Sequence, residues 1–217
     1  MIVEENKSNF LEIWHGTTTL AFIVRSGIII SVDSRASMGK YIGSGNVKKV
    51  IPINEYLLGT MAGGAADCFF WERNLGMMCN LYELQNNHRI STAGASKIFA
   101  NIIYKYKNSG LSIGAMIIGW DQTGPGLFYV DSNATRIKTK MISVGSGSTF
   151  AYGILDANYD PKLSIIKSLE LGKMAIFQAA FKDAYSGGKI NSFVMRKEGW
   201  IKVSSEDIGI EVFDKYK

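Results

Sequence analysis

Apolar residues divide the chain into unbroken or alternating runs typical of strands and into stretches with the 3.6-residue spacing of helices. The first pair of strands is predicted at 17–25 and 27–33, with a turn at Arg25-Ser26-Gly27 between them. In the second strand, the continuous run from Ile28 to Ile30 predicts burial on both faces. The other strands are predicted at 47–53, 56–61, 112–120, 126–131, 135–139, 141–145, 191–196 and 200–204.

Three long helices are predicted between these strands. The first covers residues 65–85, where large apolar residues recur at helical spacing. The second is capped by Ser91 and ends near residue 110. The third is predicted to begin at Asp160-Pro161, a capping aspartate with a first-turn proline, and to end near residue 184. A shorter helical piece is expected after the glycine-serine turn at 145–148.

The order of these elements indicates an α+β fold. Strands come first, then two helices, more strands, one long helix and a final hairpin, so an alternating β-α-β pattern with a parallel sheet is disfavoured. Two antiparallel sheets with helices outside would bury the continuous strand runs. The absence of repeats, low-complexity tracts and linkers favours a single domain. The polar leader, residues 1–16, has no long apolar core and fits neither a secretory signal nor a membrane span.

Composition and charge disfavour several classes of function. The net charge of +5 is mild and its lysines and arginines are scattered along the sequence, which favours a solvated surface over nucleic-acid binding. Cys68 and Cys79 are too few and too poorly spaced for a disulfide framework or a zinc site, and they fit a reducing compartment. The two histidines, His15 and His88, lie in the leader and in a polar connection. A histidine-based hydrolase or metal site is therefore disfavoured.

The Gly16–Thr17 junction offers a different kind of base. If this bond were cut, Thr17 would carry a hydroxyl nucleophile and a free amine on one residue, although a Gly-Thr step is also common in a turn before a strand. Lys48 and Lys49 are adjacent in a predicted strand, so one of them should point inward unless both lie on a solvated edge. An inward lysine needs a carboxylate or a lowered pKa, and Asp33 is an available partner.

A strand followed by small residues gives a second candidate feature. Residues 56–61 are apolar and lead into Ala62-Gly63-Gly64-Ala65-Ala66-Asp67 at the start of the first predicted helix. Such a turn lets backbone N–H groups approach a ligand or an oxyanion closely, and it is equally consistent with a tight strand-to-helix connection. The Gly-Lys-Ser/Thr of a phosphate-binding loop is missing.

Taken together, several segments resemble the chymotrypsin-like catalytic β subunits of the eukaryotic proteasome. The resemblance runs in order from His15 to about Ser205 with the spacing of that family, and its independent motifs make it specific. The segments that carry it are Thr17–Phe22, Val32–Ser37, Val47–Val50, Leu58–Cys68, Ser143–Ser148 and Asp183–Gly188.

The resemblance implies a fold, a processing step and a site. The fold would be the four-layer αββα sandwich of N-terminal nucleophile hydrolases, with residues 1–16 removed by autocatalytic cleavage after Gly16. Thr17 would attack the peptide bond, its amine acting as base through a water, and the Gly63 N–H would stabilise the oxyanion. The other residues implied are Asp33, Lys49, Ser146, Asp183 and Ser186 around Thr17, and Ala36, Ser37, Val47, Met61 and Ala65 for substrate binding.

The same resemblance implies the molecular setting. The partners would be other β subunits in a seven-membered ring, the adjacent α ring and unfolded polypeptide substrates, in the cytoplasm and nucleus. It implies no cofactor, no metal, no nucleic acid and no membrane. Three alternatives stay open on the sequence: a non-catalytic wall of the ring, an unprocessed precursor, and a stand-alone amidase with the same fold.

Overall fold

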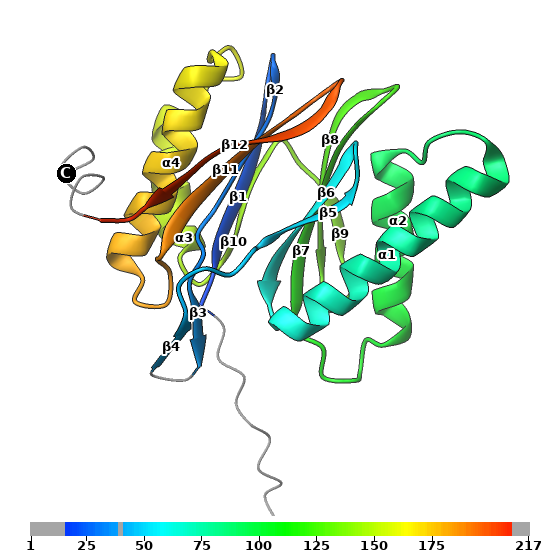
Figure 1. The fold of residues 1–217 in the computed structure, drawn as a ribbon, viewed down its shortest axis with the longest axis horizontal. Helices are drawn as coiled ribbons and strands as arrows, with labels where there is room; N and C mark the ends of the chain where they lie inside the picture. The colour runs from blue at the N-terminus through cyan, green and yellow to red at the C-terminus, as the bar shows by residue number, and fades with distance from the viewer. Residues whose placement is uncertain (1–15, 39–40, 210–217) are drawn as a thin grey trace, which may run out of the picture.

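The computed structural model describes residues 16–38 and 41–209 as a four-layer sandwich. Two five-stranded antiparallel sheets lie face to face, and a pair of helices covers the outer face of each (Figure 1). Because both faces of each sheet are covered, apolar residues fill three separate layers. The α+β sandwich with helices outside, predicted from the order of elements, is confirmed.

The first sheet contains the N-terminal strands. Its spatial order is β10-β1-β2-β11-β12, and all neighbours are antiparallel. Ile29 packs toward the helices, whereas Ile28 and Ile30 pack toward the other sheet, which confirms the two-sided burial predicted for that run. The strands are β1 (Thr18–Val24), β2 (Gly27–Val32), β10 (Met141–Gly145), β11 (Lys189–Arg196) and β12 (Gly199–Asp207).

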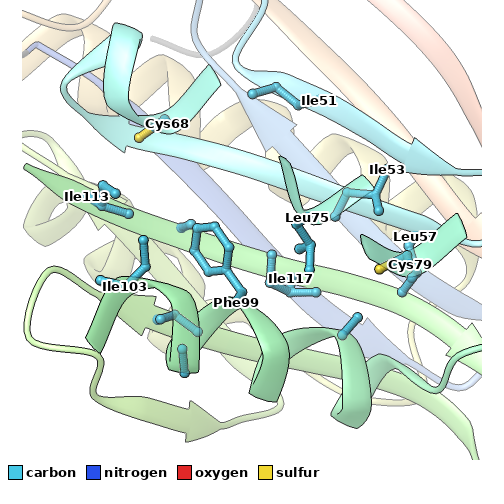
Figure 2. Close-up of a cluster of buried hydrophobic side chains, with 14 of the residues drawn as sticks. Ile51, Ile53, Leu57, Cys68, Leu75, Cys79, Phe99, Ile103, Ile113 and Ile117 are labelled. Carbon is cyan, nitrogen blue, oxygen red and sulfur yellow. The ribbon is translucent and has the colours of Figure 1, made fainter. Parts of the chain in front are cut away.

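The second sheet has the order β5-β6-β7-β8-β9. Its outer face packs against α1 (Ala65–Asn86) and α2 (Thr92–Lys105), with Leu75, Phe99 and Ile117 in the layer between them (Figure 2). The strands are β5 (Val50–Asn54), β6 (Leu57–Gly63), β7 (Ile113–Asp121), β8 (Gly124–Asp131) and β9 (Arg136–Lys138).

Some elements differ from the predictions. The strand predicted at 47–53 begins only at Val50, and a short hairpin of β3 (Ala36–Met38) and β4 (Tyr41–Ser44) was not predicted. The helix predicted to begin at Asp160-Pro161 does not start there.

Two helices cover the first sheet, α3 (Ser148–Asn158) and α4 (Ile165–Lys182). The N-cap of α4 is Ser164, whose hydroxyl accepts from the Lys167 N–H. The Asp160-Pro161 pair forms a turn instead, because the Pro161 carbonyl accepts from the Arg25 N–H between β1 and β2. The cap predicted for α2 is confirmed, since the Ser91 hydroxyl accepts from the Gly94 N–H at 3.0 Å. In the described part of the chain, no helix is long and apolar enough to span a membrane.

One carboxyl lies buried between α1 and the second sheet. Glu72 is 0% exposed, and among the described residues neither of its carboxyl oxygens has a hydrogen-bond partner. It lies directly against Gly59 of β6, where an added Cβ would overlap the carboxyl group. Burial raises the pKa of Glu72 well above its usual range, so the folded chain keeps this side chain protonated and neutral.

Glu72 therefore makes stability fall as pH rises. The unfolded chain releases this proton above its ordinary pKa of 4.5, while the folded chain retains it until the pH reaches the raised pKa of the folded state. Between these two pKa values the free energy of unfolding falls as pH rises. We expect Glu72→Gln to remove this slope, so that its melting temperature exceeds that of the wild type at pH 8 and the difference shrinks toward pH 4.5. Thermal unfolding of the full chain across this range tests it, with the exposed Glu170→Gln as control. If the melting temperatures of the wild type and Glu72→Gln change with pH in parallel, the proposed effect of Glu72 is wrong.

Candidate active site

The Gly16–Thr17 bond lies at the entrance to β1, and its carbonyl is the focus of two side chains. Thr17 is 5% exposed, and its hydroxyl donates to the Gly16 carbonyl oxygen at 2.6 Å. The Lys49 ammonium donates to the same oxygen at 3.2 Å. A hydroxyl and a cation thus meet at the carbonyl that would have to be attacked to free Thr17.

Lys49 is held in this position by a buried ion pair. Its Nζ lies 2.6 Å from Asp33 Oδ1, and the two side chains are 1% and 0% exposed. Lys49 precedes β5, and its carbonyl accepts from the Met61 N–H, which continues the ladder with β6. Lys48 is exposed. The predicted inward lysine and its partner are confirmed, although both lysines lie before the strand rather than in it.

The electrostatics of this pair favour a polarising role for the lysine. Burial lowers the pKa of Lys49 from its ordinary value, and the attraction of Asp33 opposes that change. Asp33 also accepts from the backbone N–H groups of Thr18 (2.9 Å), Gly187 (2.9 Å) and Arg35 (3.2 Å). With these donors, a buried carboxylate is satisfied and fixes the ammonium in one place.

A second network lies on the other side of Thr17. The Thr17 N–H donates to Ser146 Oγ at 3.3 Å, and the Ser146 hydroxyl donates to Asp183 Oδ2 at 2.6 Å. The Ser186 hydroxyl donates to the same Asp183 oxygen at 2.7 Å. These residues come from the turn after β10 and from the segment that ends α4, and the structure brings all three together beside Thr17, the grouping that the resemblance implied.

Gly63 ends β6 in a conformation that favours glycine. Its φ is +110°, and an added Cβ would lie 2.5 Å from the Ser112 carbonyl oxygen. The next residue donates its N–H to the same carbonyl, and α1 begins immediately afterwards. Strands β1 and β6 contact each other across the sandwich. The oxyanion role of the Gly63 N–H remains a prediction.

The predicted substrate-binding residues lie on several elements. Val47 and Met61 join the same apolar cluster beneath α1, with Met61 buried. Ala36 and Ser37 are half-buried on the β3–β4 hairpin, and Ala65 is exposed at the first position of α1. In the structure Val47 packs in the same cluster as Met61. The substrate-binding roles of all five residues remain predictions.

Sequence reasoning missed one residue, Thr18. Its backbone N–H reaches Asp33, and its hydroxyl lies 2.7 Å from Ser186 Oγ, so it contacts both networks. Nothing in the Thr17-Thr18-Thr19 run distinguishes it, because Asp33 and Ser186 are distant in the sequence and come beside it only in the folded chain.

Metal chemistry has no ligand set in the described ranges, where no three histidine, cysteine or acidic side chains gather to hold an ion. Cys68 and Cys79 are buried free thiols, and burial raises the pKa of Cys79 to about 12. Neither thiol is poised for reaction at neutral pH.

The chain is an αββα sandwich with a threonine at the start of its first strand, a lysine that donates to the preceding carbonyl, and a Ser-Asp-Ser network beside the threonine. This arrangement places it in the class of N-terminal nucleophile hydrolases. The family model described as Proteasome subunit matches residues 13–195, and the chain belongs to this family. It is 55% identical to proteasome subunit beta type-5 of Dictyostelium discoideum, covering 95% of this chain and 75% of that protein.

The chain is also similar to proteasome β subunits of vertebrates. The chain is 56% identical to proteasome subunit beta type-5 of Gallus gallus, over 91% of this chain and 77% of that protein. It is 52% identical to proteasome subunit beta type-8 of Homo sapiens, over 91% and 72%. The predicted resemblance to proteasome β subunits is confirmed.

Proposed function

We propose that Thr17 is the nucleophile of this catalytic proteasome β subunit, a threonine endopeptidase with chymotrypsin-like activity. The observation that supports this role best is the convergence of the Thr17 hydroxyl and the Lys49 ammonium on the Gly16 carbonyl oxygen. A chain that retains residues 1–16 is then a precursor, with this segment as propeptide and 17–217 as the mature domain. Residues 1–15 lie outside the described part of the structure.

Propeptide removal follows from this geometry. Thr17 Oγ attacks the Gly16 carbonyl carbon, the C–N bond breaks, and the hydroxyl proton passes to the nitrogen, which leaves an ester between Gly16 and Thr17. Water hydrolyses the ester, releasing the Gly16 carboxylate and the free Thr17 amine. Lys49 polarises the carbonyl oxygen throughout, because it already donates to it.

Peptide hydrolysis reuses the same groups. The freed amine takes the proton of Thr17 Oγ through a water, and a terminal amine titrates at about 8, which suits a base at neutral pH. Ser146, Asp183 and Ser186 orient that amine, and Asp33 holds Lys49 beside Thr17 Oγ. The Gly63 N–H stabilises the oxyanion.

The substrate is an unfolded polypeptide cleaved after a large apolar residue. It lies as an added antiparallel strand between the segments around Ser37 and Ala65, held through its backbone. The pocket for the residue before the cut is lined by Ala36, Val47, Met61 and Ala65, which carry no charge, and the flexible Met61 adapts to bulky groups.

The subunit assembles with other proteasome subunits. We place it in a seven-membered β ring next to an α ring, in the cytoplasm and nucleus, and it needs no cofactor. A non-catalytic ring wall would not require the buried Lys49–Asp33 pair directed at the Gly16 carbonyl. Family membership disfavours a stand-alone amidase.

Intact mass of the subunit from its native particle tests this function. With an epoxyketone directed at N-terminal threonines, we expect a chain that begins at Thr17 and gains one adduct. Thr17→Ala should keep its propeptide and gain none. A wild-type subunit that retains Gly16 in mature particles and gains no adduct would contradict the proposal.

A further inference from the structure

Thr18 connects the two networks that flank the nucleophile. Its backbone N–H donates to Asp33 Oδ1, the same oxygen that accepts from Lys49. Its hydroxyl contacts Ser186 Oγ at 2.7 Å, and both side chains are 0% exposed. One residue thus touches the lysine side and the serine side of the site.

The direction of the Thr18–Ser186 hydrogen bond follows from counting protons. Each serine hydroxyl has one proton. Ser186 donates its proton to the Asp183 carboxylate, which cannot donate in return. Ser186 Oγ must therefore accept from Thr18, so the Thr18 hydroxyl is the donor.

Ser146 is oriented by the same carboxylate. It donates to Asp183 at 2.6 Å, and its other possible acceptor, the Thr17 carbonyl, is farther away at 3.4 Å. A lone pair of Ser146 Oγ then faces the Thr17 nitrogen. The ordered chain of donors runs from Thr18 to Ser186 to Asp183, with Ser146 joining at the same oxygen.

The packing around Thr18 leaves its hydroxyl little freedom. An added Cβ at Gly147 would overlap Thr18 Oγ1, so the absence of a side chain at Gly147 creates the space that the hydroxyl fills. The main chain of Thr18 is fixed as well, since it pairs with Gly145 of β10. A buried hydroxyl placed this way is a fixed donor.

We propose that Thr18 is a positioning residue for the Thr17 amine, an inference that rests on the proposed function of Thr17. Its hydroxyl donates to Ser186 Oγ, which leaves the Ser186 proton directed at Asp183. Its backbone N–H donates to Asp33. Without the hydroxyl, Ser186 Oγ loses its buried donor, so it turns and weakens its bond to Asp183. Ser146 then no longer presents a fixed lone pair to the amine.

The test uses assembled particles carrying Thr18→Val, Thr18→Ser or Thr19→Val. Valine keeps the shape of threonine without the donor, and serine keeps the donor. Thr19 is the matched control, a buried threonine in the same strand whose hydroxyl donates to the Val144 carbonyl at 3.4 Å, away from both networks. Each subunit is made as a cleavable fusion that exposes Thr17, so that kinetics do not depend on propeptide removal.

For Thr18→Val we expect kcat to fall about 10²-fold with KM unchanged, because the base is misplaced while the substrate site is intact. The rate of epoxyketone adduct formation should fall in parallel. Thr18→Ser should restore both rates, and Thr19→Val should match the wild type.

The outcomes separate this inference from the function beneath it. Wild-type kcat and adduct rate in Thr18→Val would overturn the positioning role while Thr17 remains the nucleophile. Equal losses in Thr18→Val and Thr19→Val, or no rescue by serine, would also overturn it, since any buried hydroxyl would then matter equally. A wild-type particle that forms no adduct would overturn the proposed function itself.

Discussion

Lys49→Met is expected to stop propeptide removal and to lower kcat/KM for peptide hydrolysis about 10³-fold. In the folded chain Lys49 donates to the Gly16 carbonyl and pairs with Asp33 in a site closed to solvent. Methionine fills a similar volume without a proton or a charge, so the carbonyl loses its polarising donor and Thr17 Oγ loses the neighbouring cation. Both reactions use this group, so both should fail together.

The measurement is the N-terminal mass of the subunit made with its propeptide. Hydrolysis of a peptide ending in a large apolar residue is measured separately, on a cleavable fusion that exposes Thr17, because an unprocessed chain has no free amine. Lys48→Met is the matched control, because Lys48 is the exposed neighbour and should leave both readouts unchanged. Asp33 keeps three backbone donors in the variant, so the fold should survive even though an unpaired buried charge is costly. Normal processing in Lys49→Met would refute the role of the lysine.

Local pattern was sufficient for most of the fold. The run from Ile28 to Ile30 predicted a strand covered on both faces, and adjacent lysines predicted one buried and one solvated side chain, because strand-like backbone alternates its side chains. The start of α4 could not be read this way. Asp160-Pro161 has the chemistry of a helix start, yet a contact with the β1–β2 turn fixes it as a separate turn. Tertiary contact outweighed local preference there.

The site shows a similar division. Residue type and sequence neighbours pointed to Thr17, to Asp33 and to one of two adjacent lysines, and the resemblance to proteasome β subunits selected Thr17 as nucleophile and Lys49 as its neighbour. Thr18 could not be found this way, because its partner Ser186 lies 168 positions away and follows α4, which packs against β1 only in the folded chain. Sequence alone also cannot decide which proton each hydroxyl donates, since this depends on the whole set of acceptors around Asp183.

Gly63→Ala is expected to lower kcat about 10²–10³-fold, the effect of losing one oxyanion donor. At φ +110° an alanine is strained, and its Cβ would lie 2.5 Å from the Ser112 carbonyl oxygen. Relief requires the peptide at the end of β6 to rotate, which turns the Gly63 N–H away from its present direction. The same strain should lower the melting temperature, so stability has to be measured beside activity.

Gly64→Ala is the matched control for this rotation. Gly64 has an ordinary φ of −63°, and its nearest neighbour to an added Cβ is Asp67 Oδ2 at 3.1 Å, the end of a side chain that can move. We expect it to retain most of the activity. Activity per folded subunit, taken as hydrolysis rate divided by the amount of Thr17-terminated chain in assembled particles, separates chemistry from assembly. If Gly63→Ala particles assemble, begin at Thr17 and turn over peptide at the wild-type rate, the Gly63 N–H does not stabilise the transition state.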